Sequence, residues 1–524
     1  MAEGSIAKRS RADRVPLKAL ARVASVAAGV QFGWALQLSL LTPYVQELGI
    51  PHTFASYIWL CGPISGMFVQ PIVGFYSDHW EGKWGRRRPF IVLGAILVVI
   101  SVLIIGFAAD LGYILGDTPT RRPRAIGIFV VGFWFLDLAN NTLQGPCRAL
   151  LADFTGRDQR RNRRANAFFS FFISIGNILG FAAGSYNNWP KIFPFTETRG
   201  CNRPCANLKS AFMIDLILLI VTTLLSITAA QEIPWSPLTK AQKHGVSTPT
   251  TPLIPDKPDP QYADDPENVN DDDEDEEEES EAFFWELVGT LRDLPRPMWC
   301  ILLVTALTWL AWFPFTLFDT DWFGREVFKG EPGSATAQIY DRGVRMGSFG
   351  LMLNSVVLGI TSIVMEPLCR MLKPSFVWGI GNFIMAASFA AMIAITYAMK
   401  NTDRVIPPTG TTIGALVVFA ALGAPLAVTY SIPFALASHS TNNSGGGQGL
   451  AMGVLNLAVV VPQIIISLGS GPWDALFGGG NVPSFALALG ASFIGGVLAF
   501  LILPRPAPEF RSRSIRRTRS SPIP

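Results

Sequence analysis

Four polar side chains recur within one apolar stretch of the chain, at about residues 129–151. They are Asp137, Asn141, Gln144 and Arg148, and their spacings of four, three and four residues place them on one face of a helix. A charged side chain at the centre of a bilayer costs about 2.5 to 3.5 kcal/mol even on lenient insertion scales, so such residues usually face a water-filled cavity or a partner helix. The stripe therefore indicates a polar site within a membrane, whose carboxyl, amide and guanidinium groups can bind hydroxyl groups and a proton.

Asp137 lies near the centre of this stretch and is the expected proton carrier. Burial away from water favours the neutral form of a carboxyl group, which can donate a hydrogen bond, whereas the ionised form prefers an arginine or water. The alternative is an aspartate that stays paired with a neighbouring helix. At 1.5 Å per residue, Arg148 lies roughly 16 Å further along and does not pair with Asp137 in this helix. Arg148 is expected to contact a substrate or gate on the cytoplasmic side, or else to extend to the membrane interface.

The composition is that of an integral membrane protein. Hydrophobic residues make up 49% of the 524 residues, charged residues only 15%, and the mean hydropathy is +0.34, which excludes an ordinary soluble domain. Apolar stretches of about eighteen residues or more predict an all-α membrane protein with about twelve membrane-spanning helices. These stretches lie near residues 19–41, 54–76, 89–110, 125–151, 165–186, 209–230, 296–318, 346–366, 375–399, 412–437, 449–470 and 483–503.

The predicted helices fall into two six-helix halves. A segment rich in Pro and Thr, followed by the acidic run 271–279, separates the sixth span from the seventh. Such a segment is expected to be a disordered linker, or else to bind a regulatory partner. Weak repeats, of Trp34 and Thr42 with Trp312 and Thr320, are typical of transporters built from duplicated bundles. The expected organisation is a tail at 1–18, a bundle at 19–230, the linker at 231–294, a second bundle at 295–503 and a basic tail at 504–524.

The basic residues predict the orientation of the chain. Lys and Arg are more frequent in the short loops on the side of the two termini than in the opposite loops. By the positive-inside rule, this bias predicts cytoplasmic termini.

The loop after the second span, at residues 74–89, is a candidate gate. It resembles the loop signature of the major facilitator superfamily, because Asp78 precedes a glycine and the basic residues Arg86 and Arg87. An acid that faces arginines at the cytoplasmic rim can hold one closed arrangement of the bundle. Positive-inside anchoring is the alternative explanation for the arginines.

A second candidate gate lies at the outer end of the seventh span. Asp321 and Arg325 are one helical turn apart, Glu326 is beside them, and Asp319 precedes them. An exposed pair of this kind contributes little, but in an outward-facing vestibule it can close the entrance.

Three motifs resemble the plant-type sucrose:proton symporters, a branch of the glycoside–pentoside–hexuronide:cation group of the major facilitator superfamily. They lie at residues 22–52, 136–150 and 319–326, and the resemblance extends over all the predicted spans. It implies a proton-coupling role for Asp137, essential roles for Asp321 and Arg325, and a place near the substrate entrance for His52, for which a solvated loop histidine is the alternative. The first helix is most similar to the branch often found on the vacuolar membrane, so we expect a multi-pass protein of the plasma or vacuolar membrane.

A disaccharide needs many paired donors and acceptors and a flat apolar surface for its ring. Trp34 or Phe135 can supply the surface. Asn177 follows Ser170 and Ser174 along one face of the fifth span, where interhelical hydrogen bonding explains these residues equally well. The expected substrate-binding residues are Trp34, Gln37, His52, Asp137, Asn141, Gln144, Arg148 and Asn177.

Neither a cofactor nor a metal site is expected. The sequence contains no Gly-x4-Gly-Lys-Ser/Thr loop, which disfavours an ATP-driven pump, and no Cys/His cluster with zinc spacing. Cys201 and Cys205 share an outer loop where a disulfide can form, although a three-residue gap strains the ring and leaves their pairing open. The expected partners are sucrose, a co-transported proton and the lipid bilayer, with no nucleic acid and no prediction of the oligomeric state.

The sequence therefore predicts a transporter, not an enzyme, that carries sucrose and related glucosides together with a proton by alternating access. Two alternatives stay open. The long acidic linker is compatible with a sugar sensor or receptor on a transporter scaffold, and transport without proton coupling would make the protein a facilitator.

Overall fold

A computed structural model describes residues 16–80, 82, 84–118, 121–155, 159–229, 294–402, 407–442 and 448–503. Nearly all of the acidic linker and both tails lie outside these ranges. The first half of the chain forms α2 (Leu17–Ala24), α3 (Val26–Glu47), α4 (His52–Ile58), α5 (Cys61–His79), α6 (Arg88–Gly106), α7 (Ala108–Ile114), α8 (Pro123–Thr155), α9 (Gln159–Ser185), α10 (Trp189–Ile192), the 3-10 turn η1 (Pro194–Thr196) and α11 (Arg203–Ala229). The second half forms α14 (Arg296–Trp322), the π-helical turn η2 (Phe323–Val327), α15 (Ala337–Leu372), α16 (Pro374–Lys400), α17 (Thr409–Asn442), α18 (Gln448–Leu476) and α19 (Val482–Leu501).

Twelve helical segments of the described chain are long and apolar enough to cross a membrane, which confirms the all-α membrane fold. Several of them are longer than the hydropathy pattern predicts, among them the seventh and the eighth. The seventh span continues through the predicted gate to Val327, and the eighth begins at Ala337. The added turns carry charged side chains such as Asp321 and Asp341, which lower the hydropathy although they are paired inside the fold.

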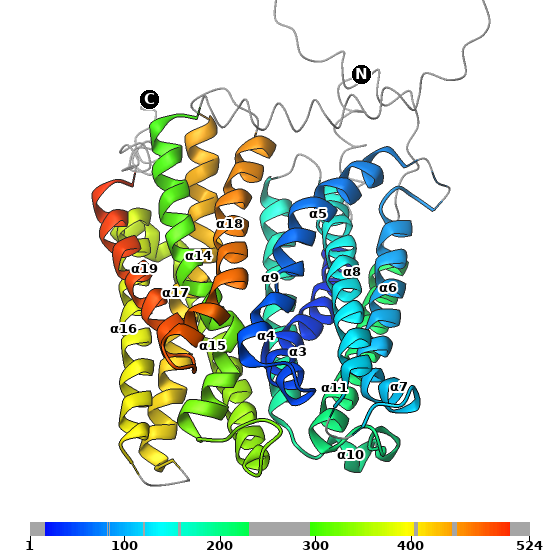
Figure 1. The fold of residues 1–524 in the computed structure, drawn as a ribbon. Coiled ribbons are helices and arrows are strands. Elements are labelled where there is room, and N and C mark those ends of the chain that lie inside the picture. Colours follow the sequence, from blue (N-terminus) through cyan, green and yellow to red (C-terminus); the bar gives the residue numbers. More distant parts are fainter. Residues whose placement is uncertain are drawn as a thin grey trace, which may run out of the picture.

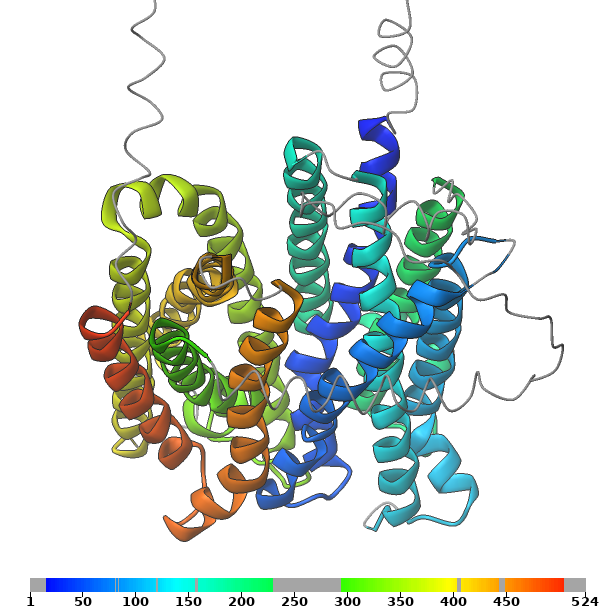
Figure 2. The ribbon, with the colours of Figure 1, turned by 90° about the horizontal axis from the view of Figure 1, so that it is seen from above.

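The helices form two bundles that stand side by side, α2 to α11 and α14 to α19 (Figures 1 and 2). The first spanning helix of each bundle packs in the same way, α3 on α9 and α11, and α14 on α18 and α19. Between the bundles, α9 packs on α15 and α5 packs on α18, while α3 meets α14. This repeated arrangement agrees with the two six-helix halves expected from the sequence.

The two halves are joined at one face of the molecule. The helix ends nearest the two termini lie at the top in Figure 1, and we call this the termini face. Residues from both halves, such as Leu36, Leu41, Phe318 and Phe323, share one apolar core toward the opposite face. Toward the termini face, the second half packs around its own core, which includes Ile301 and Trp378. The bundles are therefore tied together at the face opposite the termini.

Close helix contacts within the first half depend on glycines. A Cβ atom added to Gly176 of α9 would lie 2.4 Å from the backbone oxygen of Ala28 in α3, whereas one added to Gly127 of α8 meets no atom within 4 Å.

Gly176→Ala is expected to destabilise the protein by about 1 to 3 kcal/mol, because the backbones of α3 and α9 must separate to admit the methyl group. The midpoint of thermal unfolding in detergent should fall. Gly127→Ala is the matched control and should be neutral or slightly stabilising, since alanine favours helix. Equal midpoints for the two variants would contradict the α3–α9 contact.

Candidate functional site

The acid predicted to carry a proton is buried between α8 and α5. The exposed fraction of Asp137 is 1%. Ser65 donates a hydrogen bond to Asp137 Oδ2 at 3.2 Å, and Asn141 Nδ2 donates to Ser65 Oγ at 2.9 Å and to the backbone oxygen of Asp137 at 2.9 Å. Gly62 of α5 lets the helices approach, since a Cβ atom there would lie 3.2 Å from Asp137 Oδ2.

The second carboxyl oxygen of Asp137, Oδ1, has no hydrogen-bond partner within the described part of the chain. An ionised carboxylate without a cation in such a place costs several kcal/mol. The surroundings therefore favour the protonated acid, whose remaining hydrogen-bonding capacity is open to a ligand.

The other two members of the stripe border a cavity that Asp137 does not line. The cavity has a volume of about 280 Å³ and is bounded by Gln31 of α3, Gln144 and Arg148 of α8, and Phe169 of α9. The guanidinium carbon of Arg148 lies 5.4 Å from the centre of the Phe169 ring, which is a cation–π contact. Asp137 and Asn141 thus contact α5, whereas Gln144 and Arg148 face α3 and α9.

Asn177 of α9 does not line this cavity but contacts the cavity residue Gln31. It accepts a hydrogen bond from Gln31 Nε2 at 2.9 Å, so the amide that lines the cavity also fixes α3 to α9. Sequence reasoning missed Gln31, although an amide one turn before Trp34 in an apolar helix was a signal of the same kind as Gln144.

Trp34 and Gln37 lie on α3 in different surroundings. Trp34 is half-buried, whereas Gln37 is fully buried. Neither the indole nitrogen of Trp34 nor the amide of Gln37 has a hydrogen-bond partner among the described residues. Phe135 is 51% exposed, in line with the exposed Val131 and Leu138 on α8, and so lies on the outer surface of the bundle and away from the cavity.

A polar cluster joins the two halves at the face opposite the termini. It consists of Gln46 and His52 from the first half and Asp321, Arg325 and Asp474 from the second, and we call it the inter-half cluster. His52 Nδ1 lies 3.5 Å from Asp321 Oδ2, and His52 Nε2 lies 3.7 Å from Asp474 Oδ2. Arg325 pairs with Asp321 Oδ1 at 3.1 Å and also donates to Gln46 Oε1.

Residues of the second half hold the acids of this cluster in position. Tyr340 donates to Asp321 Oδ1 at 2.6 Å, and Asn481 Nδ2 donates to Asp321 Oδ2 at 3.1 Å. The backbone N–H of Asn481 donates to Glu326 Oε1 at 3.2 Å, and Ser484 donates to Asp474. Because these acids have several partners within the second half, the second-half residues of the cluster are held in place where His52 and Gln46 contact them.

Asp319 lies six residues before Arg325 and outside this network. Its Oδ1 accepts a hydrogen bond from the backbone N–H of Thr320 at 2.5 Å, and it is buried. Thr320 in turn donates to the backbone oxygen of Ser39 at 2.7 Å, which adds a further bond between the halves.

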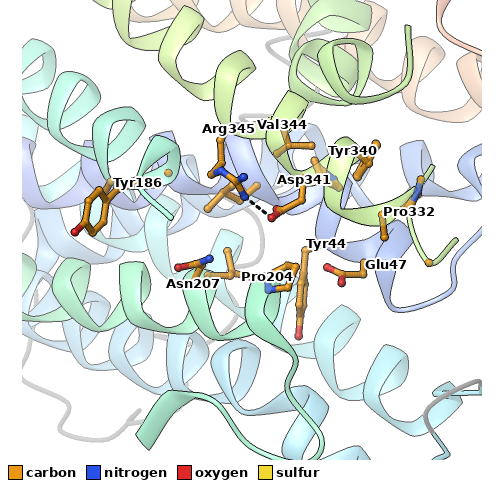
Figure 3. A pocket seen from close by; sticks show the side chains of 17 residues that line it. Tyr44, Glu47, Tyr186, Pro204, Asn207, Pro332, Tyr340, Asp341, Val344 and Arg345 are labelled. Carbon is orange, nitrogen blue, oxygen red and sulfur yellow. Dashed lines mark hydrogen bonds and ion pairs between the residues drawn. The ribbon is translucent and has the colours of Figure 1, made fainter. Parts of the chain in front are cut away.

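Next to the inter-half cluster, a pocket of about 590 Å³ opens between the halves. Figure 3 shows Asp341 and Arg345 of α15 paired on one side, with Asn207 and Glu47 on the other. Tyr340 lines the pocket and also bonds to Asp321, so the pocket and the cluster share a wall.

The structure joins Cys201 and Cys205 in a disulfide. Asn202, within the closed loop, donates to Glu47 Oε1 at 2.6 Å, and the Tyr44 hydroxyl lies 3.5 Å from Cys205 Sγ. The loop therefore contacts the last turn of α3, directly beside Gln46.

At the termini face, the predicted arginines pair with an acid that the sequence did not single out. Arg86 lies 2.8 Å and Arg87 3.3 Å from Asp153 at the end of α8, and Arg87 also donates to Ser77 at 2.5 Å. The side chain of Asp78 lies outside the described residues. All the partners described here belong to the first half, so this group ties α5, α6 and α8 to one another.

The described residues contain no group of three or more His, Cys, Asp or Glu side chains that could hold a metal ion. The arrangement offers instead a buried acid, a cavity lined by amides and a guanidinium, and a polar cluster that joins the two bundles.

Comparison with known proteins gives consistent results. Residues 23–465 match the family model described as Major Facilitator Superfamily. The chain is 55% identical over 513 residues to the sucrose transport protein SUT2 of Oryza sativa subsp. indica, which covers 96% of each chain. It is 54% identical over 496 residues to the sucrose transport protein SUC4 of Arabidopsis thaliana, covering 94% of this chain and 91% of that one.

Two solved structures have the same fold. The nucleoside transporter NupG gives a TM-score of 0.60 at 13% identity, covering 93% of this chain and 99% of its own. A D-xylose-proton symporter gives a TM-score of 0.57 at 14% identity, covering 92% of this chain and 97% of its own. At these identities the likeness concerns the fold alone.

Arg325→Ala is expected to weaken the contact between the halves, because Asp321 and Gln46 both lose their partner. Ser348 of α15 is a suitable reporter, since it is fully buried and faces Gly184 of α9 across the halves. In a Ser348→Cys protein, Arg325→Ala should raise the rate of labelling by a membrane-impermeant thiol reagent about tenfold, which corresponds to about 1.4 kcal/mol.

Arg345→Ala is the matched control for this labelling experiment. It also removes an arginine from an i,i+4 pair with an aspartate, but that pair lies within α15. The labelling rate should stay unchanged. An equal rise in both variants would show that Arg325 has no special role in joining the halves.

Proposed function

The chain belongs to the Major Facilitator Superfamily and, within it, to the sucrose transport proteins, and on that premise we propose that it moves sucrose together with a proton by alternating access. The observation that carries this proposal is the 55% identity to a sucrose transport protein over 96% of both chains. The site then has to supply three things: partners for sugar hydroxyls, a group that changes its protonation, and a gate.

The cavity residues suit the recognition of a sugar. Gln31 and Gln144 offer amide donors and acceptors, and Arg148 offers a planar set of donors, while Asn177 holds the Gln31 amide from behind the cavity wall. A bound hydroxyl needs such partners because it leaves water without another source of hydrogen bonds. We propose that the sugar binds along this wall, with Trp34 as the apolar surface for a ring.

Asp137 is the proposed proton carrier. Its burial and its unpartnered Oδ1 support a protonated carboxyl, which donates a hydrogen bond. Asn141 and Ser65 connect Asp137 to the next turn of the same stripe, where Gln144 faces the cavity. Loss of the proton would create a buried charge without a cation, so we propose that the proton leaves only when the rearranged helices admit water to the acid.

The inter-half cluster is the proposed gate at the outer face. With the termini in the cytoplasm, as the positive-inside bias predicts, the structure corresponds to a state closed toward the outside. Among the described residues, every hydrogen bond or ion pair between the halves lies at this outer face. Opening would require His52 and Gln46 to leave Asp321, Arg325 and Asp474.

The proton supplies enough driving force for accumulation. One charge that moves through 100 mV releases about 2.3 kcal/mol, which supports a sugar gradient of roughly 50-fold before any pH difference is added. No nucleotide hydrolysis is therefore needed.

Asp137→Asn is expected to abolish sucrose-evoked proton uptake, because an amide cannot release a proton. Radiolabelled sucrose uptake and external pH should be followed together in a heterologous cell. Exchange of sucrose across the membrane at equal concentrations should persist in the variant and serves as the control for folding and binding. Normal coupled proton uptake by Asp137→Asn would exclude this residue as the carrier, and pH-independent uptake by the unmodified protein would indicate an uncoupled facilitator.

Deletion of residues 255–281 separates transport from sensing. These residues belong to the predicted acidic linker and lie outside the described part of the chain. A transporter should keep most of its sucrose flux without them, because the linker does not belong to either bundle, and uptake in the same cells measures this. A loss of signalling with little flux before or after deletion would favour a sugar sensor.

A further inference from the structure

A second acid is buried in the first half of the molecule, and the functions described above do not use it. Asp215 lies in the middle of α11, is 1% exposed and faces α3. A Cβ atom on Gly33 of α3 would lie 2.9 Å from Asp215 Oδ2, so this glycine leaves room for the carboxyl group against α3. Asp215 Oδ1 has no hydrogen-bond partner within the described ranges.

No described cation is placed to neutralise Asp215. The basic residue nearest along α11 is Lys209, six residues away or about 9 Å of helix, and it is engaged by Asp110 and lies over the ring of Phe107 at 4.4 Å. The residues of α3 around the contact are Gly33, Trp34 and Gln37, which are uncharged. The other described charged or titratable groups on elements packed against α11 lie at helix ends: Lys18 and Arg22 of α2, Arg88 of α6, Tyr44 and Glu47 of α3, Lys191 of α10, and Arg203 of α11 itself.

The contact between α3 and α11 continues one turn further, where a Cβ atom on Gly29 would meet Thr222 and Leu219 of α11. Burying an ionised carboxylate in such a dry, close-packed seam costs several kcal/mol when no cation compensates it. The observed packing therefore requires an uncharged Asp215. Once ionised, the acid would need water, which the seam admits only if α3 and α11 separate.

Because α3 carries Gln31 of the cavity and Gln46 of the inter-half cluster, its position affects both the proposed sugar site and the proposed gate. We propose that Asp215 is a proton-sensitive switch at the contact between α3 and α11. Asp215 is protonated while α3 packs on α11, and it loses its proton to water when the two helices separate. This inference rests on the proposed function. It differs from the role of Asp137 because the proton of Asp215 sets the transport rate and is not carried with the sugar.

Asp215→Asn tests the switch, since asparagine has the shape of the protonated acid and cannot ionise. Sucrose uptake and proton uptake should be measured over a range of external pH. We expect the ratio of uptake in acidic medium to uptake in neutral medium to fall about threefold or more, because one of two titrating groups has been removed. The number of protons moved per sucrose should stay as in the unmodified protein.

Thr222→Val is the matched control, because it removes a polar group from the same seam without removing a titratable one. Its pH profile should equal that of the unmodified protein. An unchanged pH profile for Asp215→Asn would overturn the inference, as would a changed proton-to-sucrose ratio. If the unmodified protein itself moves no proton with sucrose, the proposed function fails instead, so the two failures are distinguishable.

A spectroscopic measurement covers the case in which Asp215→Asn does not fold. In Asp137→Asn protein, infrared difference spectra recorded as the pH is raised should still contain the loss of one buried protonated carboxyl band. A combined Asp137→Asn and Thr222→Val protein should give the same band. Absence of the band in a protein that still binds sucrose would overturn the inference.

Discussion

A carboxyl group that leaves water must keep its proton or find a cation, and this constraint divides the acids inside the membrane part of the protein into two kinds. Asp321 has Arg325 and lies near His52. Asp137 and Asp215 are equally buried, but no described cation pairs with either carboxyl group: Asp137 Oδ2 accepts a hydrogen bond from Ser65, and each acid lies against a glycine of a neighbouring helix. The paired acid joins helices of the two bundles, whereas the unpaired acids are suited to binding a proton.

The paired and the unpaired acids also lie at different positions along the helices. The inter-half cluster lies at the helix ends, where an opening leads to water and charges can be solvated once the halves separate. Asp137 and Asp215 lie within the first bundle, each against a glycine that brings a second helix close. Movements of helices within this bundle therefore change the surroundings of both acids, while movements between bundles change those of Asp321. A transport cycle needs the two kinds of movement to be linked, and α3 takes part in both.

The sequence was informative where residues within one segment form a recognisable pattern. The helical spacing of the stripe on α8 identified Asp137, Gln144 and Arg148, and hydropathy identified all twelve spans. It failed where contacts between different helices decide the structure. The predicted seventh span ended at residue 318, before its observed end at Val327, and the predicted eighth span began at residue 346, after its observed start at Ala337. Hydropathy treats a charged residue as exposed even when it is paired inside the fold. Sequence reasoning missed Gln46 and Asp474, because nothing in their own segments indicates that Arg325 bonds to Gln46 or that His52 lies beside Asp474. Which way Phe135 and Gln37 point depends on how α8 and α3 turn in the bundle, and the roles of these residues toward a sugar stay predictions.

The arrangement of α3 has a mechanical consequence. Among its glycines, α3 approaches α11 most closely at Gly29 and Gly33, which suits this part of the helix as a pivot. Gln31 lies within the pivot, whereas Gln46 is thirteen residues, or about 20 Å, away from Gly33. A tilt of about ten degrees would displace Gln46 by about 3 Å, enough to break its hydrogen bond, while the amide in the cavity hardly moves. A small tilt of α3 about Gly29 and Gly33 therefore hardly moves Gln31 but displaces Gln46 enough to separate it from Arg325.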